Sequence, residues 1–318
     1  MSPLLTIAIC TYNRAELLRE CLGALTRQTA PAAAWELLVI DNNSPDETPE
    51  VVDAFLAANP ATRGRRVLET KQGLSHARNR AYAEAAAPWV LYLDDDAKAR
   101  EDFAARALYI IQQTDHRIVG GVYYPWYHYG RPAWYRDRYA SNALPHRKLT
   151  VPGGNYTACG GVMLWERNLL EELGGFDPKI GMIGTKLAYG EETYLQAKAA
   201  ALGVRPAYDP DLVIYHVVAP FKLKVDYFFR SYFLAGRDAV VGGQVGTGTG
   251  SLLLQFLIGL AVMTKDFLRC TPKLLFQSNY YRENWLIDVF RKMAKRVGRI
   301  YTAVLLDRPP TPPRSAEK

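Results

Sequence analysis

Short apolar runs alternate with amphipathic segments through the first two thirds of the chain. Runs of four to eight residues that are rich in branched and aromatic side chains predict strands, whereas apolar residues at three- and four-residue spacing predict helices. Predicted strands cover residues 4–10, 36–40, 66–69, 89–93, 118–122, 162–165 and 212–216. Predicted helices cover residues 14–28, 47–58, 76–86 and 191–202, with a short one before residue 174. This order predicts an α/β fold with a mainly parallel sheet that helices cover on both faces.

Three adjacent acids, Asp94, Asp95 and Asp96, follow the predicted strand 89–93. Neighbouring carboxylates repel one another, and burying them without partners is costly. A divalent cation would remove this conflict, and oxygen ligands suit Mg²⁺ or Mn²⁺. The alternative is a turn whose charges lie in water, and these residues alone do not decide between the two.

A second acid, Asp41, follows the predicted strand 36–40. Ligands of such sheets bind at the carboxyl ends of the strands, so we expect Asp41 and Asp94 to share one crevice. The turn after the first strand, residues 11–14, holds neither a G-x-G-x-x-G pattern nor a P-loop. Dinucleotide-binding and phosphate-loop proteins are therefore disfavoured.

An aromatic segment follows the strand 118–122. Its rings can stack on sugars, lie at a membrane interface, or pack this long loop against the rest of the domain. The sequence leaves these alternatives open. The rings are Tyr123, Tyr124, Trp126, Tyr127, Tyr129, Trp134, Tyr135 and Tyr139.

The last third of the chain has a different pattern. Residues 252–263 form an almost unbroken apolar run, shorter than the roughly 20 residues that span a bilayer, which predicts a buried core helix or one in the membrane plane. Residues 286–305 place apolar side chains on one side of a helix and basic ones on the other. This predicts either contact with a membrane surface through residues 285–305 or docking on the body with a solvated basic face.

The distribution of charge limits the kinds of binding partner, and the cysteines indicate the redox compartment. The chain has 318 residues and a net charge of +7, all of it carried by residues 265–318. Because residues 1–264 are neutral, we expect no nucleic-acid surface on the body and an acidic partner for the C-terminal part. Four cysteines without metal-site spacing suggest a reducing compartment, and we expect no secretory signal at the N-terminus.

Six segments, in this order, resemble the successive motifs of family 2 glycosyltransferases. The resemblance covers about residues 4–218 and implies a GT-A (Rossmann-like) domain over residues 1–220. A helical region at 221–306 and a disordered Pro-rich tail at 307–318 would follow. The segments are Leu5–Arg14 (LTIAICTYNR), Leu38–Thr48 (LVIDNNSPDET), Gly73–Ala81 (GLSHARNRA), Trp89–Asp96 (WVLYLDDD), Gly174–Asp177 (GGFD) and Gly190–Leu195 (GEETYL).

The resemblance implies transfer of a sugar from a nucleotide-diphosphate sugar with inversion at the anomeric carbon. A divalent cation, Mn²⁺ or Mg²⁺, would neutralise the leaving diphosphate. Asp96 of the DXD motif would be the main metal ligand, and Asp94 would face the ribose or the metal's waters. Asp95 is the least certain of the donor-binding acids. His216 would complete the metal shell, as in several relatives, or be structural.

Further donor contacts follow from the same resemblance. Thr11, Tyr12 and Arg14 would surround the nucleotide base, and Asp41 would contact the base or its ribose. The alternative for Asp41 is a cap on the following turn. Arg78 would pair with the diphosphate or form an ion pair on a helix surface.

Glu191 and Glu192 stand where the family has the acidic pair that supplies the catalytic base. The second residue is commonly the base, so we expect Glu192 to act, with Glu191 as the alternate. The family usually has Asp at the second position, and Glu lengthens the arm by one carbon. Alternatively, both acids only complement the dipole of a helix N-terminus.

These features predict a glycosyltransferase at the inner face of the cell membrane, on the cytoplasmic side, acting on a lipid-linked or polysaccharide acceptor in surface-glycan synthesis. One alternative is a sugar nucleotidyltransferase, which needs a glycine-rich basic N-terminal loop that this chain lacks. The other is a non-catalytic sugar-nucleotide-binding protein, against which the acids at 94–96 and 191–192 argue.

Overall fold

The computed structural model describes residues 2–154, 156–180, 190–241 and 249–306. The predicted tail at 307–318 lies outside the described residues. The chain forms two compact units. Unit 1 comprises Met1–Trp126 with Asp137–Val217, and unit 2 comprises Tyr127–Arg136 with Val218–Lys318.

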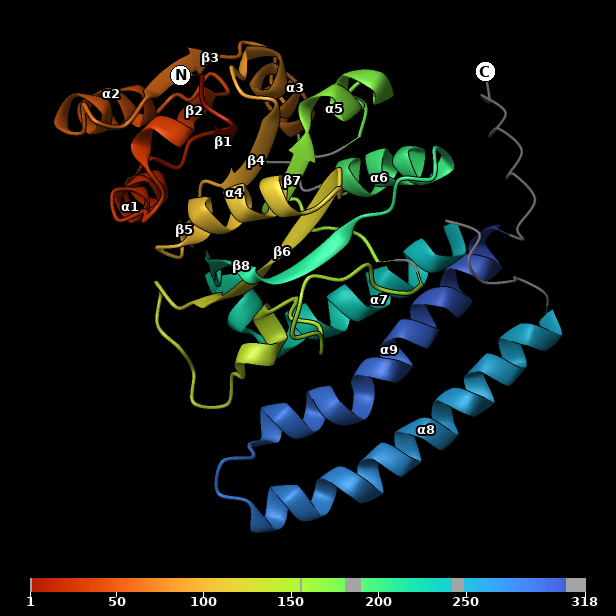
Figure 1. The fold of residues 1–318 in the computed structure, drawn as a ribbon. Coiled ribbons are helices and arrows are strands. Elements are labelled where there is room, and N and C mark those ends of the chain that lie inside the picture. Colours follow the sequence, from red (N-terminus) through yellow and green to blue (C-terminus); the bar gives the residue numbers. More distant parts are fainter. Residues whose placement is uncertain (1, 155, 181–189, 242–248, 307–318) are drawn as a thin grey trace, which may run out of the picture. The chain divides into compact units, whose positions relative to one another are not determined.

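Unit 1 is built on a sheet with the strand order β3-β2-β1-β4-β7-β6-β8-β5 (Figure 1). The first four strands in this order are parallel, β7 is antiparallel to both β4 and β6, and β8 is parallel to β6 and antiparallel to β5. The predicted α/β sheet is thus confirmed, as a mixed one. The strands are β1 (Leu5–Thr11), β2 (Trp35–Asp41), β3 (Gly64–Leu68), β4 (Trp89–Asp94), β5 (Ala97–Ala99), β6 (Ile118–Trp126), β7 (Val162–Glu166) and β8 (Ala207–Val217).

Helices cover both faces of this sheet, which explains why its central strands are continuously apolar. Leu5, Ile7 and Ile9 of β1 pack in one core with α1, α2 and α4, whereas Ala8 packs in a second core with α3, α5 and α6. The helices are α1 (Ala15–Leu25), α2 (Thr48–Ala58), α3 (Leu74–Glu84), α4 (Phe103–Gln113), α5 (Arg167–Leu173) and α6 (Glu191–Ala201).

The strand register brings polar residues together at one edge of the sheet. In the parallel ladder Thr11 of β1 pairs with Asp41 of β2, and Cys10 pairs with Asp94 of β4. Asp41 and Asp94 therefore lie at the same edge of the sheet, on the two strands that flank β1, and the predicted shared crevice stays a prediction. Because β6 and β8 run in the same direction as β4, the end of β8 with His216 lies at this edge too.

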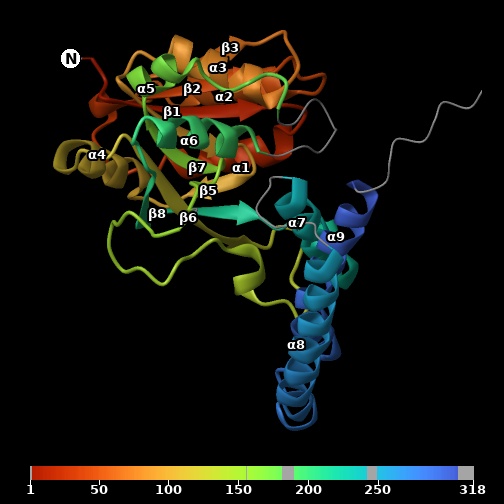
Figure 2. The same cartoon turned by 90° about the vertical axis from the view of Figure 1, so that its right-hand side faces the viewer.

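Unit 2 holds three long helices, α7 (Val225–Val241), α8 (Thr249–Phe276) and α9 (Arg282–Leu306), with α9 packed against both of the others (Figures 1 and 2). The predicted helical C-terminal extension is confirmed. The α7–α9 crossing depends on two glycines. A Cβ on Gly236 would lie 1.9 Å from the carbonyl oxygen of Lys295, and a Cβ on Gly298 would lie 2.0 Å from that of Phe233.

Part of the predicted aromatic segment packs in unit 2. The carbonyl oxygen of Trp134 accepts a hydrogen bond of 2.7 Å from Asn284 Nδ2 of α9, and its ring lies 6.0 Å from that of Phe228. The Arg136 guanidinium lies 5.1 Å from the ring centre of Tyr280. Residues 127–136 thus leave unit 1 and complete the packing of the C-terminal helices.

The two predicted C-terminal helices form, and both are longer than predicted. Leu253 and Leu257 of α8 are exposed, so residues 252–263 are not a buried core helix. On α9, Val289 is buried, whereas Val297 and Tyr301 are exposed. Among the helices that the structure describes, none is both long and apolar enough to cross a membrane.

Candidate functional site

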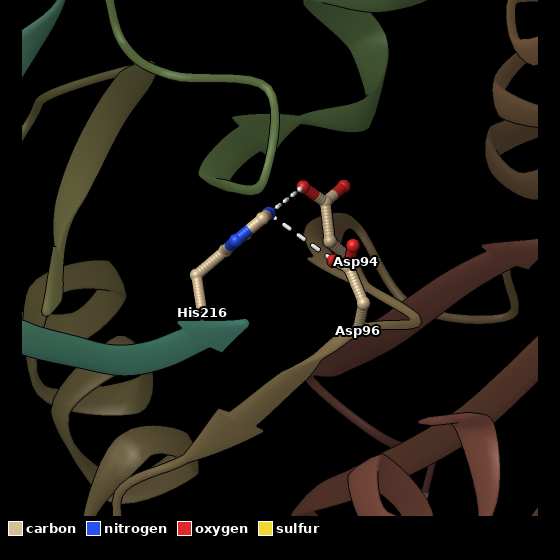
Figure 3. Close-up of side chains that lie close together, drawn as sticks. All are labelled: Asp94, Asp96 and His216. Carbon is tan, nitrogen blue, oxygen red and sulfur yellow. Dashed lines mark ion pairs between the residues drawn. The ribbon is translucent and has the colours of Figure 1, made fainter. Parts of the chain in front are cut away.

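Two aspartates and a histidine converge at the edge where β4, β5 and β8 meet (Figure 3). Asp94 ends β4, Asp96 precedes β5, and His216 lies in β8 opposite Ala97 of β5. His216 Nε2 lies 3.4 Å from Asp94 Oδ2 and 3.1 Å from Asp96 Oδ1. One nitrogen and two oxygens therefore lie within 4.8 Å of one another and can serve as ligands to one metal ion.

The chemistry of these atoms fits a cation. His216 Nδ1 lies 2.9 Å from the carbonyl oxygen of Val217, which only accepts, so Nδ1 carries the proton. Nε2 faces two carboxylates, an arrangement that a positive charge stabilises, either a proton on the ring or a metal ion between the three groups. Asp96 Oδ1 is also buried without a hydrogen bond. Two carboxylate oxygens and an imidazole nitrogen suit Mn²⁺, and the carboxylates also suit Mg²⁺.

Arg14 engages the acidic triplet from another direction. Its Nη1 lies 3.0 Å from both Asp95 Oδ1 and Asp96 Oδ2, and these charges, Asp95 above all, raise the pKa of Arg14. Asp95 and Asp96 are buried, so the alternative of a solvated turn is wrong. The predicted contact of Arg14 with the base stays a prediction.

The acids of the triplet differ in their proton affinity. Burial raises the pKa of Asp95 to about 6, helped by repulsion from Asp96 and opposed by Arg14. Burial also acts to raise the pKa of Asp94, but the hydrogen bond and charge of His216, together with Arg78 and Arg14, outweigh it and hold that pKa below the ordinary value. Asp94 and Asp95 thus lie in different electrostatic environments although they are neighbours in the chain.

A buried ion pair joins α3 to α6. Arg78 Nη1 lies 2.7 Å from Glu191 Oε1, both side chains are almost fully buried, and Arg78 Nη2 donates to the carbonyl oxygen of Gly160 at 3.2 Å. The alternative of an ion pair on a helix surface is therefore wrong. The predicted contact of Arg78 with a diphosphate stays a prediction.

Glu192 follows in the first turn of α6 and is only partly buried. Burial raises the pKa of its carboxyl group, and repulsion from Glu191 adds to this, while the charge of Arg78 acts in the opposite direction. The acidic pair is thus divided, because Glu191 is held by Arg78 while Glu192 is a half-exposed carboxylate with increased basicity.

The remaining predicted donor residues lie along the same edge. Asp41 is buried at the end of β2, where its Oδ1 accepts a hydrogen bond of 2.9 Å from the backbone N–H of Ser44. It therefore caps the turn, the alternative considered for it, and its contact with a base or ribose stays a prediction. Thr11 is buried beside it and Tyr12 is half-buried.

Two site residues that the motifs did not single out are Gly160 and Gly161. A Cβ on Gly161 would lie 2.3 Å from Asp94 Oδ2, and one on Gly160 would lie 2.6 Å from Arg78 Nη2. Their turn therefore touches both Asp94 and the buried Arg78. The available signal was the small-residue run Cys159-Gly160-Gly161 before a strand.

Comparison with known proteins places the chain in a family. The profile of glycosyl transferase family 2 matches residues 6–174. Glycosyltransferase AglE of Haloferax volcanii is 26% identical over 219 residues, covering 69% of this chain and 68% of that protein. Glycosyltransferase GlyG of Streptococcus pneumoniae is 29% identical over 126 residues, covering 39% and 40%. A PGL/p-HBAD biosynthesis glycosyltransferase of Mycobacterium tuberculosis is 35% identical over 122 residues, covering 38% and 46%. The last two matches span less than half of the relatives' own length.

Solved structures agree in fold. The mannosyltransferase PcManGT from Pyrobaculum calidifontis, in complex with GDP-Man and Mn²⁺, has a TM-score of 0.62 at 19% identity, over 95% of this chain and 88% of that one. TarS 1–349 of S. aureus, in complex with UDP, has a TM-score of 0.53 at 12% identity, over 95% and 90%. These likenesses show the GT-A fold. With the family profile matching more than half of its length, the chain belongs to glycosyl transferase family 2.

Proposed function

We propose that this protein is a metal-dependent, inverting glycosyltransferase that moves a sugar from a nucleotide-diphosphate sugar to a hydroxyl group. The cluster of Asp94, Asp96 and His216 at the carboxyl edge of the sheet carries the proposal. The GDP-Man and Mn²⁺ of PcManGT and the UDP of TarS support a sugar-nucleotide donor and a divalent metal.

A metal ion held by these three residues would have a defined role in the reaction. Mn²⁺ or Mg²⁺ held by Asp94, Asp96 and His216 would supply positive charge to the departing diphosphate. Arg14 is fixed by Asp95 and Asp96 beside the same site. Asp95 then has a positioning role, because it orients Arg14.

The donor nucleotide would lie along the edge formed by Thr11, Tyr12 and Asp41, next to the metal ligands. Arg78 is held by Glu191 and by the carbonyl oxygen of Gly160. We therefore propose that Arg78 acts on the diphosphate through the field of its buried positive charge rather than through a direct bond.

Inversion requires a base that removes the acceptor's proton on the face opposite the leaving group. We propose Glu192 for this role because its carboxylate is partly exposed and its pKa is raised. Glu191 anchors the first turn of α6 through Arg78 and so positions Glu192.

The acceptor proposal is a lipid-linked saccharide or polysaccharide, used in surface-glycan synthesis at the inner face of the cell membrane. Its support is the excess of positive charge in residues 265–318. On this proposal residues 1–220 carry the chemistry and residues 221–306 bring the protein to its acceptor.

The proposal is tested by incubating the protein with UDP- and GDP-sugars and Mn²⁺, with and without acceptor glycans, and measuring the release of nucleoside diphosphate. Asp96→Ala and chelation with EDTA should each abolish turnover, whereas Asp115→Ala, which removes an exposed acid after α4, should leave it unchanged. Full turnover by Asp96→Ala would contradict the metal-dependent mechanism. Donor binding without turnover on any acceptor would favour the sugar-nucleotide-binding alternative.

A further inference from the structure

Helix α8 has a continuous apolar face that points away from its neighbouring helix. Leu253, Leu257, Leu268 and Leu275 are exposed by 62%, 52%, 67% and 70%. Their spacing of four, eleven and seven residues places them on one side of an α-helix, along most of its length. A contiguous exposed patch of this kind indicates an interaction surface, unlike single leucines scattered over a protein.

The opposite side of α8 is already occupied. A Cβ on Gly259 would lie 2.7 Å from Met293 Sδ of α9, and the buried Asp266 pairs with Lys292 of α9 at 2.8 Å. Figures 1 and 2 show α8 beside α9 along its course. Helix α9 therefore covers one side of α8 and leaves the leucines on the other.

The charge next to these leucines has one sign. Asp266 is the only acid in the sequence of α8, and it is buried and engaged by Lys292 and Arg269. The bases Lys265 and Arg269 stand on one flank of the leucine face. Lys265 and Arg269 line an open depression together with Leu268, so cationic and apolar groups share one surface.

The combination of exposed leucines and neighbouring bases favours one kind of binding partner for this face of α8 over another. A second copy meeting the same face would bring Lys265 and Arg269 toward their own equivalents, which is unfavourable. An anionic lipid surface instead takes leucines into the acyl boundary and attracts lysine and arginine at the headgroups. The bases of α8 lie in its C-terminal half, at residues 265–273, beside Leu268 and Leu275.

We propose that the outward face of α8 is the membrane-contacting surface of this protein and that it binds anionic lipid. The inference depends on the proposed membrane location but not on the proposed chemistry. It assigns the contact mainly to α8, because Ile287 and Val289 of α9 are buried and the apolar stripe of α9 is exposed only towards its end, at Val297, Tyr301 and Val304.

The test is flotation of the full chain with vesicles of phosphatidylcholine containing phosphatidylglycerol, compared with phosphatidylcholine alone. Replacing Leu253, Leu257, Leu268 and Leu275 together by Gln should weaken binding by about 100-fold or more, because four exposed apolar side chains are lost. These residues are exposed, so the thermal unfolding temperature should not change. The matched control replaces Leu68 and Leu202, exposed leucines of unit 1, by Gln and should bind as the unmodified protein does.

A second variant probes the charge. Lys265→Gln should lower affinity for anionic vesicles by about 5-fold, the contribution of one cation near such a surface. Lys148→Gln with Lys179→Gln, exposed lysines elsewhere, should have no effect.

Three results would overturn the inference. They are failure of the unmodified protein to bind anionic vesicles, equal binding by the leucine variant, and a dimer in sedimentation velocity that the leucine substitutions dissociate. Release of nucleoside diphosphate from a soluble donor, measured in parallel, keeps this result separate from the proposed chemistry. A leucine variant that no longer binds vesicles but still releases nucleoside diphosphate supports both the membrane contact and the proposed chemistry. Vesicle binding by an unmodified protein that shows no turnover rejects only the proposed chemistry.

Discussion

At the scale of single residues, the acidic triplet shows how one charge conflict is divided among several partners. Asp95 and Asp96 share Arg14, whereas Asp94 and Asp96 face His216. Asp96 therefore takes part in both arrangements, one oxygen in each. This makes it the acid whose loss disturbs most contacts, in agreement with its expected role as the main metal ligand.

Glu192 gives a prediction about pH. A base must be ionised, and because the pKa of Glu192 is raised, its ionised fraction falls at a higher pH than for an ordinary glutamate near 4.3. At saturating Mn²⁺, kcat/KM should therefore decline on acidification through a pKa above that value. Glu192→Gln should lower kcat by about 10²- to 10⁴-fold and remove this limb from the residual activity. A limb that persists in Glu192→Gln would assign the base to another residue.

The Arg78–Glu191 pair gives a prediction about stability. Removing one partner leaves a buried charge uncompensated, so Arg78→Met and Glu191→Met should each lower the free energy of unfolding by about 3–5 kcal/mol. The double variant should lose less than the sum of the two, measured by urea unfolding. The control is Arg80→Ala, which breaks the exposed Arg80–Glu84 pair and should cost under about 1 kcal/mol. Additive losses would mean that the pair is not coupled.

At the scale of elements, the strands that are apolar on both faces were predicted correctly. A continuous apolar run is visible in the sequence without knowing which strand it pairs with. β1, β2 and β4 begin and end within a residue or two of the predicted bounds. The three-residue β5 was missed, since its pairing with β8 exists only in the tertiary structure. The start of β8 was placed too late. Asp209-Pro210-Asp211 has the sequence of a turn, but these residues lie within the strand, where Asp209 is buried and paired with Arg106.

In the candidate site, too, some residues could be predicted from the sequence and some contacts could not. Asp94 and Asp96 stood out because they follow an apolar run within a family motif, and His216 because it ends an apolar run where several relatives have a metal-binding histidine. The Arg78–Glu191 pair joins residues 113 positions apart, and the approach of Gly161 to Asp94 depends on how a turn folds over the sheet. No local pattern encodes such contacts, so they required the structure.

The α7–α9 crossing gives a prediction at this scale. Gly298→Ala would place a methyl group 2.0 Å from the carbonyl oxygen of Phe233, which is rigid backbone, so the helices must separate. We expect a loss of about 1–3 kcal/mol in the free energy of unfolding. Gly23→Ala in α1 is the control, because nothing lies within 4 Å of the added methyl group. That change should stabilise by about 0.5–1 kcal/mol, since glycine is a poor helix former. Equal effects of the two substitutions in chemical denaturation would contradict the close crossing.

At the scale of the whole molecule, the proposed metal ion and donor nucleotide both bind unit 1, whereas unit 2 has its own core around Cys270, Tyr280 and Val289. Mn²⁺ with UDP or GDP should therefore raise the unfolding temperature of the calorimetric transition that belongs to unit 1. At a ligand concentration 100 times Kd the stabilisation is about 2.7 kcal/mol. His216→Ala should lose this response and His146→Ala, with an exposed histidine, should keep it. A uniform shift of all transitions would contradict separate units.

The aromatic segment has a consequence for synthesis on the ribosome. Trp134 is made 150 residues before Asn284, the α9 residue that donates to its carbonyl oxygen. At about 5–20 residues per second, residues 127–136 wait roughly 8–30 seconds for that helix to emerge. During this interval a segment containing Tyr127, Trp134 and Tyr135 has no α9 to pack against. The middle of the chain therefore reaches part of its native contacts only after most of the C-terminal third has been made.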